Sequence, residues 1–160
     1  MNKTEIYKFL SEHHIKYEAT EHKAVFNIEE LNALELPHPE WDAKNLFIRD
    51  DKKQNYYLIT VKGDKRINLK EFRKSQQLRP LTFASEEDLM KHLQLIPGSV
   101  SPLGILNDES KRIHFYLDSD FVGNMIGIHP NENTATVWME ADQLVQIIQE
   151  HGNPVDVIHI

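Results

Sequence analysis

The sequence contains no cysteine, and this absence removes several kinds of chemistry at once. Disulfide bonds, thiolate nucleophiles and cysteine-ligated zinc sites are all excluded. The chain also has no apolar run of signal-peptide length, and none near the roughly 20 residues that a membrane-spanning helix requires. We therefore expect no membrane partner and a cytoplasmic location.

The motifs of nucleotide and metal chemistry are missing as well. The sequence has no P-loop, no G-x-G-x-x-G after a strand, no G-x-S-x-G turn and no H-E-x-x-H. Its nine histidines are scattered and show no ligand spacing. We predict neither a cofactor nor a metal site.

The composition indicates one globular domain over residues 1–160, with 40% hydrophobic and 27% charged residues. The net charge of −7 is unevenly distributed. Residues 62–79 hold seven basic and two acidic side chains, so this segment carries +5 and the remainder −12. An acidic protein with one basic face can still bind a phosphate backbone. The alternative is an ordinary solvated helix face.

Helices and strands are mixed along the chain. Apolar spacing and capping residues predict helices at 6–10, at 27–34 with Asn27 as cap, at 68–76, from Ser85 to Pro97, and around 144–148. Strand patterns occur at 17–21, 45–49, 56–61, 81–84, 103–106, 113–117, 125–129, 134–139 and 155–160. Several strands follow one another as hairpins, including 103–106 with 113–117. This arrangement favours a mixed α+β fold with a mixed, partly barrelled sheet.

Three local features are candidates for chemistry. Lys44 directly precedes an apolar strand, where an ammonium can bind a phosphate or a developing oxyanion. Residues 97–104 form a Gly- and Pro-bracketed loop that can offer backbone N–H groups. His129 ends a strand and could orient a hydroxyl or transfer a proton. Each also has an ordinary structural explanation: a surface lysine, a connecting loop and a structural histidine.

Seven segments together resemble the YbaK-like family of tRNA-editing domains, in particular its freestanding ProX (PrdX) type associated with prolyl-tRNA synthetase. They occur in the family's order and cover nearly the whole chain. The segments are EHKAV (21–25), AKNLFIRD (43–50), YYLI (56–59), DKRINLK (64–70), LTFAS (81–85), PGSVSPLG (97–104) and HPNENTAT (129–136).

The resemblance implies hydrolysis of the ester that joins alanine to the 3′ end of proline tRNA. A synthetase pocket rejects a smaller side chain by only about 1–3 kcal/mol, so a separate editing step is needed. By the family pattern, Lys44 is catalytic and anchors the terminal phosphate and ester region, and Asn45 binds polar groups of the substrate. His129 positions the adenosine or amino acid, and a ribose hydroxyl helps to activate water. Backbone donors of the G-x-x-x-P loop hold the carbonyl, and that loop is Gly98, Ser99, Val100, Ser101 and Pro102.

The resemblance also gives the basic segment a partner, the acceptor stem and 3′ end of tRNA(Pro). Prolyl-tRNA synthetase is a second expected partner, and DNA is not. The residues expected to contact tRNA are Lys62, Arg66, Lys70, Arg73, Lys74 and Arg79.

Three alternatives stay open at this point. The same fold could remove cysteine or serine from a tRNA. It could be a non-catalytic tRNA-binding or regulatory module, although the intact Lys44 and 98–102 features argue against a loss of catalytic activity. An unrelated small-molecule hydrolase would not need the basic segment.

Overall fold

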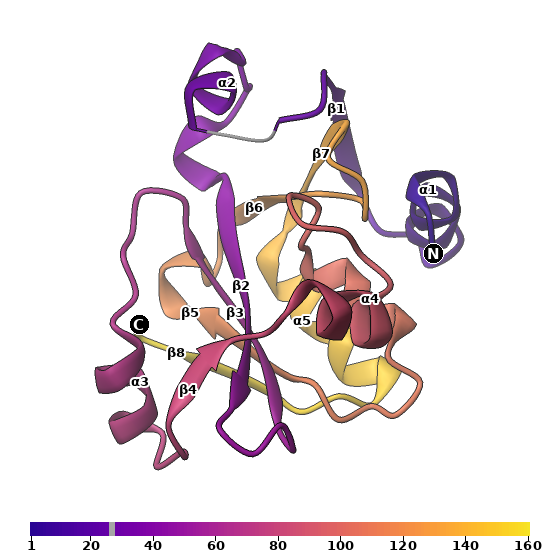
Figure 1. The fold of residues 1–160 in the computed structure, drawn as a ribbon. Coiled ribbons are helices and arrows are strands. Elements are labelled where there is room, and N and C mark those ends of the chain that lie inside the picture. Colours follow the sequence, from indigo (N-terminus) through magenta and orange to yellow (C-terminus); the bar gives the residue numbers. More distant parts are fainter. Residues whose placement is uncertain (26–27) are drawn as a thin grey trace.

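The computed structural model describes residues 1–25 and 28–160 (Figure 1). Its helices are α1 (Lys3–Glu12), α2 (Ile28–Ala33), α3 (Leu69–Ser75), α4 (Glu86–Leu93) and α5 (Ala141–His151), with 3-10 turns η1 (Pro39–Trp41), η2 (Pro102–Asn107) and η3 (Ser119–Phe121). Its strands are β1 (Tyr17–Glu21), β2 (Ala43–Asp50), β3 (Tyr56–Lys62), β4 (Leu81–Phe83), β5 (His114–Asp118), β6 (Met125–Ile128), β7 (Ala135–Glu140) and β8 (Val155–Ile158). In this described part of the chain, no helix has the length and apolar character needed to cross a bilayer.

The strands form two sheets. The larger has the order β4-β2-β3-β5-β8, in which β2 is antiparallel to β3 and β4, and β5 is parallel to β3 and β8. The smaller, β1-β7-β6, is antiparallel. A backbone bridge between Asp42 and Gly127 connects them. The predicted mixed α+β fold is confirmed, but over the described residues the sheets stay separate and do not close into a barrel.

The two faces of the larger sheet pack against different helices. On one face, Phe47 of β2 joins the main hydrophobic cluster, to which α1, α4, α5 and the smaller sheet also contribute. On the other face, Ile48 packs in a second cluster with Phe72 of α3. Successive residues of a strand point to opposite faces, so β2, β3, β5 and β8 divide their apolar side chains between the two clusters. Figure 1 shows α3 on one side of the sheet and α4 and α5 on the other.

Local capping signals define three helix ends as predicted. Asn68 accepts a hydrogen bond from the backbone N–H of Glu71 at the start of α3. Ser85 and Asp88 form a reciprocal capping box at α4. Caps of this kind stabilise a helix by about 1 kcal/mol. Gly152 ends α5 at φ 111°, a backbone conformation that favours glycine. The predicted cap Asn27 lies outside the described residues.

The structure corrects one predicted element and one predicted helix end. Residues 103–106 are not a strand but belong to η2, because Ser101 caps its first turn by accepting from Leu103 N–H, and Pro102 has the fixed φ of a helix start. Residues 113–117 therefore have no hairpin partner there, and β5 instead lies between β3 and β8. The α4 helix ends at Leu93 rather than near Pro97, since Gln94 adopts the left-handed conformation at φ 56°.

Candidate active site

A cavity of about 210 Å³ opens where the start of β2 meets the end of β6. It brings together four residues that the sequence predicted to bind substrate, from three segments far apart in the chain: Asn45, Gly98, Val100 and His129. The rest of its lining is Asp42, Ala43, Gly127 and Ile128. The cavity is thus built at the seam between the two sheets.

Asn45 is fixed by its cross-strand neighbour. It pairs with Thr60 of β3, and the buried Thr60 hydroxyl donates to Asn45 Oδ1 at 2.6 Å. This bond orients the amide, because Thr60 binds its oxygen and makes no contact of this kind with its NH₂ group. Asn45 therefore presents a hydrogen-bond donor suited to a carbonyl oxygen.

The 98–102 loop supplies backbone to the cavity and packs its other side chains behind it. Gly98 has φ 86°, so it can make a turn that an L side chain would strain. The N–H of Ser99 donates to the carbonyl of Ile96 at 3.1 Å, and the Ser99 side chain is buried. The Ser101 hydroxyl donates to the carbonyl of His129 at 2.6 Å. The Ser101 hydroxyl thereby attaches the loop to the end of β6, and neither Ser101 nor the buried Pro102 is part of the cavity lining.

His129 is held as a neutral imidazole. Burial lowers its pKa below the ordinary value, the hydrogen bond with the Ala135 carbonyl opposes this, and His22 acts in the lowering direction. The His129 Nδ1 lies 2.9 Å from the Ala135 carbonyl oxygen, which assigns the proton to Nδ1. The Nε2 atom is then an acceptor, as a group that orients a hydroxyl or a water requires.

Lys44 lies on the opposite face of β2 from Asn45. Its ammonium donates to the carbonyl oxygen of Lys65, in the turn that follows β3, and Lys44 is not part of the cavity lining. The side chain of Lys65 in turn pairs with Asp118 at 2.5 Å and Asp120 at 3.2 Å. Lys44 is thus on the face that carries α3, beside the start of the basic segment.

The basic segment begins next to the cavity and runs away from it through α3. The N–H of Gly63 donates to the Asp42 carbonyl at 2.8 Å, and Lys62 lies 4.7 Å from the ring centre of Trp41. At the far end, Arg79 forms a two-pronged ion pair with Asp51, at 2.8 and 3.0 Å. Of the residues between these ends that were predicted to contact tRNA, three are exposed and Arg73 is half-buried; the exposed ones are Arg66, Lys70 and Lys74.

Asp42 is a lining residue that the sequence analysis missed. Burial raises the pKa of its carboxyl to about 6, while a hydrogen bond from the backbone N–H of Ala43 acts in the opposite direction. An aspartate before a strand normally suggests a solvated turn. Nothing in the neighbouring sequence reveals that β6, a distant segment, covers this one.

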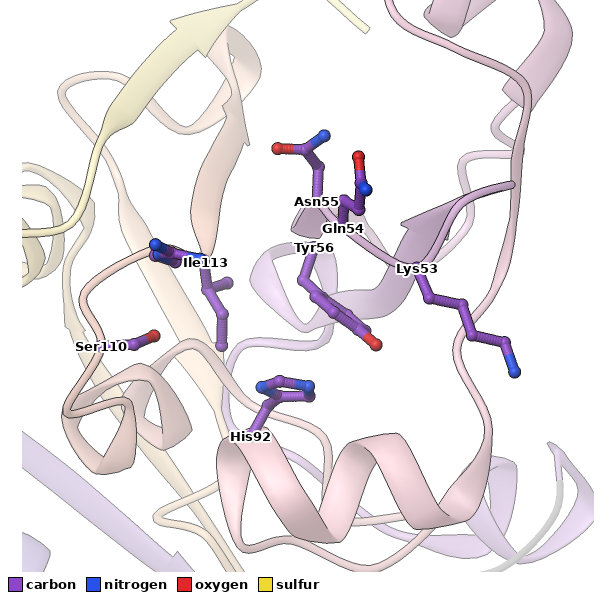
Figure 2. Close-up of a pocket in the computed structure, with 8 residues that line it drawn as sticks. Lys53, Gln54, Asn55, Tyr56, His92, Ser110 and Ile113 are labelled. Atoms are coloured by element: carbon purple, nitrogen blue, oxygen red, sulfur yellow. The ribbon is translucent and has the colours of Figure 1, made fainter.

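A second, larger hollow of about 700 Å³ lies at the other end of the β2–β3 hairpin. Figure 2 shows Tyr56 and His92 pointing toward each other across it, while Lys53 extends away. The two rings lie 4.1 Å apart between centroids. Its lining contains none of the predicted site residues. By size alone this hollow is the better candidate for a ligand site, but the polar groups suited to binding an ester converge in the smaller cavity.

Asp118, Asp120 and His159 have ligand atoms within 4.8 Å of one another, a spacing that could hold a metal ion. The ammonium of Lys65 already pairs with both carboxylates. These acids therefore have a protein counter-ion, and their grouping is explained by the attachment of the Lys65 turn to β5 and η3.

Comparisons with known proteins identify the family of this chain. Residues 22–147 match the model of the aminoacyl-tRNA editing domain. The chain is 37% identical over 152 residues to the prolyl-tRNA editing protein ProX of Acetoanaerobium sticklandii, covering 94% of this chain and 93% of that protein. It is 30% identical over 164 residues to the prolyl-tRNA synthetase associated domain-containing protein 1 of Xenopus laevis, covering 97% and 95%.

A solved structure of similar fold is that of a candidate trans-editing enzyme for prolyl-tRNA synthetase. It has a TM-score of 0.69 and 20% sequence identity, and the match covers 98% of this chain and 96% of that one. The family match includes every lining residue of the smaller cavity. The chain therefore belongs to the aminoacyl-tRNA editing domain family.

Proposed function

We propose that this single domain is a trans-acting deacylase that hydrolyses the ester of alanine wrongly attached to tRNA(Pro). The observation that carries the proposal is the convergence of Asn45, the 98–100 backbone and neutral His129 in one small cavity. The relationship to a prolyl-tRNA editing protein over nearly its full length supports tRNA as the substrate.

The groups in the cavity are suited to ester hydrolysis by positioning. The Asn45 amide and the backbone N–H groups of Gly98 and Val100 hold the carbonyl oxygen and stabilise its negative charge as water adds. His129 Nε2 accepts a hydrogen bond from the attacking water or from the neighbouring ribose hydroxyl, which assists in activating the water. The water oxygen bonds to the carbonyl carbon, the ester C–O bond breaks, and the ribose oxygen takes a proton. The products are free alanine and a tRNA with an intact 3′ end.

Lys44 and the basic segment serve the tRNA in this proposal. Lys44 anchors the terminal phosphate from the α3 side of β2, after exchanging its contact with the Lys65 carbonyl for the phosphate. The exposed cations Arg66, Lys70 and Lys74 then follow the acceptor stem, with mostly phosphate contacts. Prolyl-tRNA synthetase is the source from which such an enzyme would receive its substrate.

The amino acid is selected by size. Gly127, Val100 and Ile128 give the cavity an apolar part, which admits the methyl group of alanine and excludes the bulkier ring of proline. The side chains of cysteine and serine are close to alanine in size. The test must therefore compare these cargoes directly.

The test is deacylation of alanyl-, cysteinyl-, seryl- and prolyl-tRNA(Pro) by the wild type and by Lys44→Ala and Asn45→Ala. We expect rapid loss of alanine alone. Asn45→Ala should be slowed about 10²-fold or more, the scale for removing one oxyanion-stabilising group. Lys44→Ala should also be slower, because it loses the anchor for the terminal phosphate. Lys52→Ala is the matched control, because Lys52 is an exposed lysine of the distant hairpin loop. Preference for cysteine or serine would change the cargo, and no turnover of any substrate would refute the proposal in favour of a binding module.

A further inference from the structure

Asp42 lines the cavity, and its carboxyl group has no balancing cation among the described residues. The group is largely buried, and in the described part of the chain its hydrogen-bond donor is the backbone N–H of Ala43. No ion pair among the described residues includes it. Buried carboxylates are normally paired, so this one is a candidate functional group.

Hydrogen bonds on both sides fix the backbone that carries the Asp42 side chain. The carbonyl of Asp42 accepts from Gly63 N–H at 2.8 Å, and its own N–H donates to the carbonyl of Pro39 at 3.3 Å. Its backbone also bridges to Gly127 of the smaller sheet. A side chain held in this way is preorganised for a ligand instead of adapting to it.

The other polar groups of the cavity are neutral. Asn45 is an amide, and burial keeps His129 as a neutral imidazole. At neutral pH Asp42 is therefore the charged residue of this lining, and it attracts the positive end of a ligand. An isolated buried charge costs folding free energy, which a bound cation offsets.

We infer that the Asp42 carboxylate binds the α-ammonium group of the aminoacyl ester. This inference rests on the proposed function and names the part of the substrate that the site reads. The α-carbon that carries the ammonium is bonded directly to the ester carbonyl carbon. When Asn45 and the 98–100 loop hold the carbonyl, the ammonium therefore lies in the same cavity. The subsite recognises a free α-amino group and rejects hydroxyacyl, N-acylated and peptidyl esters.

The test is binding of two non-hydrolysable ligands, 3′-amino-3′-deoxyadenosine carrying either an alanyl or a lactyl group through an amide. The lactyl ligand replaces the ammonium with a hydroxyl of nearly the same size. Calorimetry at pH 7.5 should show the alanyl ligand bound 10- to 100-fold more tightly by the wild type, the range for a hydrogen-bonded charge. Asp42→Asn should reduce this ratio to about 1. Asp64→Asn, the same change at an exposed aspartate of the next turn, should keep it.

The inference is overturned if the wild type binds the two ligands equally or binds neither, or if Asp42→Asn keeps the preference. Deacylation of alanyl-tRNA(Pro) is measured in parallel. Turnover of alanyl-tRNA(Pro) without a preference for the alanyl ligand would refute the Asp42 subsite and still support the proposed function. A preference for the alanyl ligand that depends on Asp42, without turnover of the tRNA, would refute the deacylase function and still support an aminoacyl-binding site.

Discussion

Replacing Asp42 with asparagine should make the protein more stable at neutral pH. The asparagine side chain has nearly the same shape and can still accept the hydrogen bond from Ala43 N–H, but it carries no charge into the cavity. The unfolded carboxyl ionises near 3.8 and the folded one near a pKa of about 6. At 1.36 kcal/mol per pH unit, this difference costs the wild type about 3 kcal/mol at pH 7.5.

The sign of the pH dependence distinguishes this explanation from simple repacking. The folded state keeps its proton to higher pH than the unfolded state, so the wild type loses stability relative to the variant as pH rises from about 4 to 6. The gain from Asp42→Asn should therefore fall to about 0.5 kcal/mol at pH 4. Urea unfolding at pH 4, 5, 6 and 7.5 measures both limits, with Asp64→Asn expected within about 0.5 kcal/mol of the wild type throughout. A gain that is absent at pH 7.5, or equal at all four pH values, would refute the reasoning.

Three further predictions concern stability and tRNA binding. Burial acts to raise the pKa of Asp108, but its hydrogen bonds lower the pKa on balance. Asp108→Ala should therefore reduce the free energy of unfolding in urea by about 2–4 kcal/mol at pH 7. A reduction that persists as the pH falls well below 4 would contradict this prediction. Gly127→Ala places a methyl group 2.3 Å from the buried ring of Trp138 and should cost about 1–3 kcal/mol, seen as a lower Tm; an unchanged Tm would show that the ring can move. Neutralising Arg73 and Lys74 to glutamine should weaken tRNA binding and reduce the slope of log K against log salt by about 0.7–0.9 for each phosphate that the variant no longer neutralises; an unchanged slope would show that neither side chain binds a phosphate.

Much of the secondary structure could be predicted because its determinants are local. The Asn68 cap and the Ser85–Asp88 box each involve residues three positions apart, so the sequence contains both partners. The strand predicted at 103–106 failed for the opposite reason. An apolar run suits a buried 3-10 turn as well as a strand, and the parallel neighbours of β5 are distant in the chain.

The site was predicted in part. Asn45 and His129 were identified through the family motifs, and the structure places both in one cavity. The separation of Lys44 from Asn45 follows from the alternation of a strand and could have been expected once residues 45–49 were assigned to one. Asp42 could not be found in this way, because it lines the cavity together with Gly127, a residue of the other sheet to which its backbone bridges.

Because the cavity lies between the two sheets, its selectivity for an amino acid depends on how the sheets are packed together. Asn45 is a residue of β2, whereas His129 follows β6, so the two halves of the cavity are carried by different sheets. A small rotation of one sheet against the other changes the distance between the halves while each keeps its own hydrogen bonds. Phe47 and Val137 pack in the core that the two sheets share. Selection for a new amino acid should therefore recover substitutions at such interior positions, which contact no substrate, alongside those in the lining.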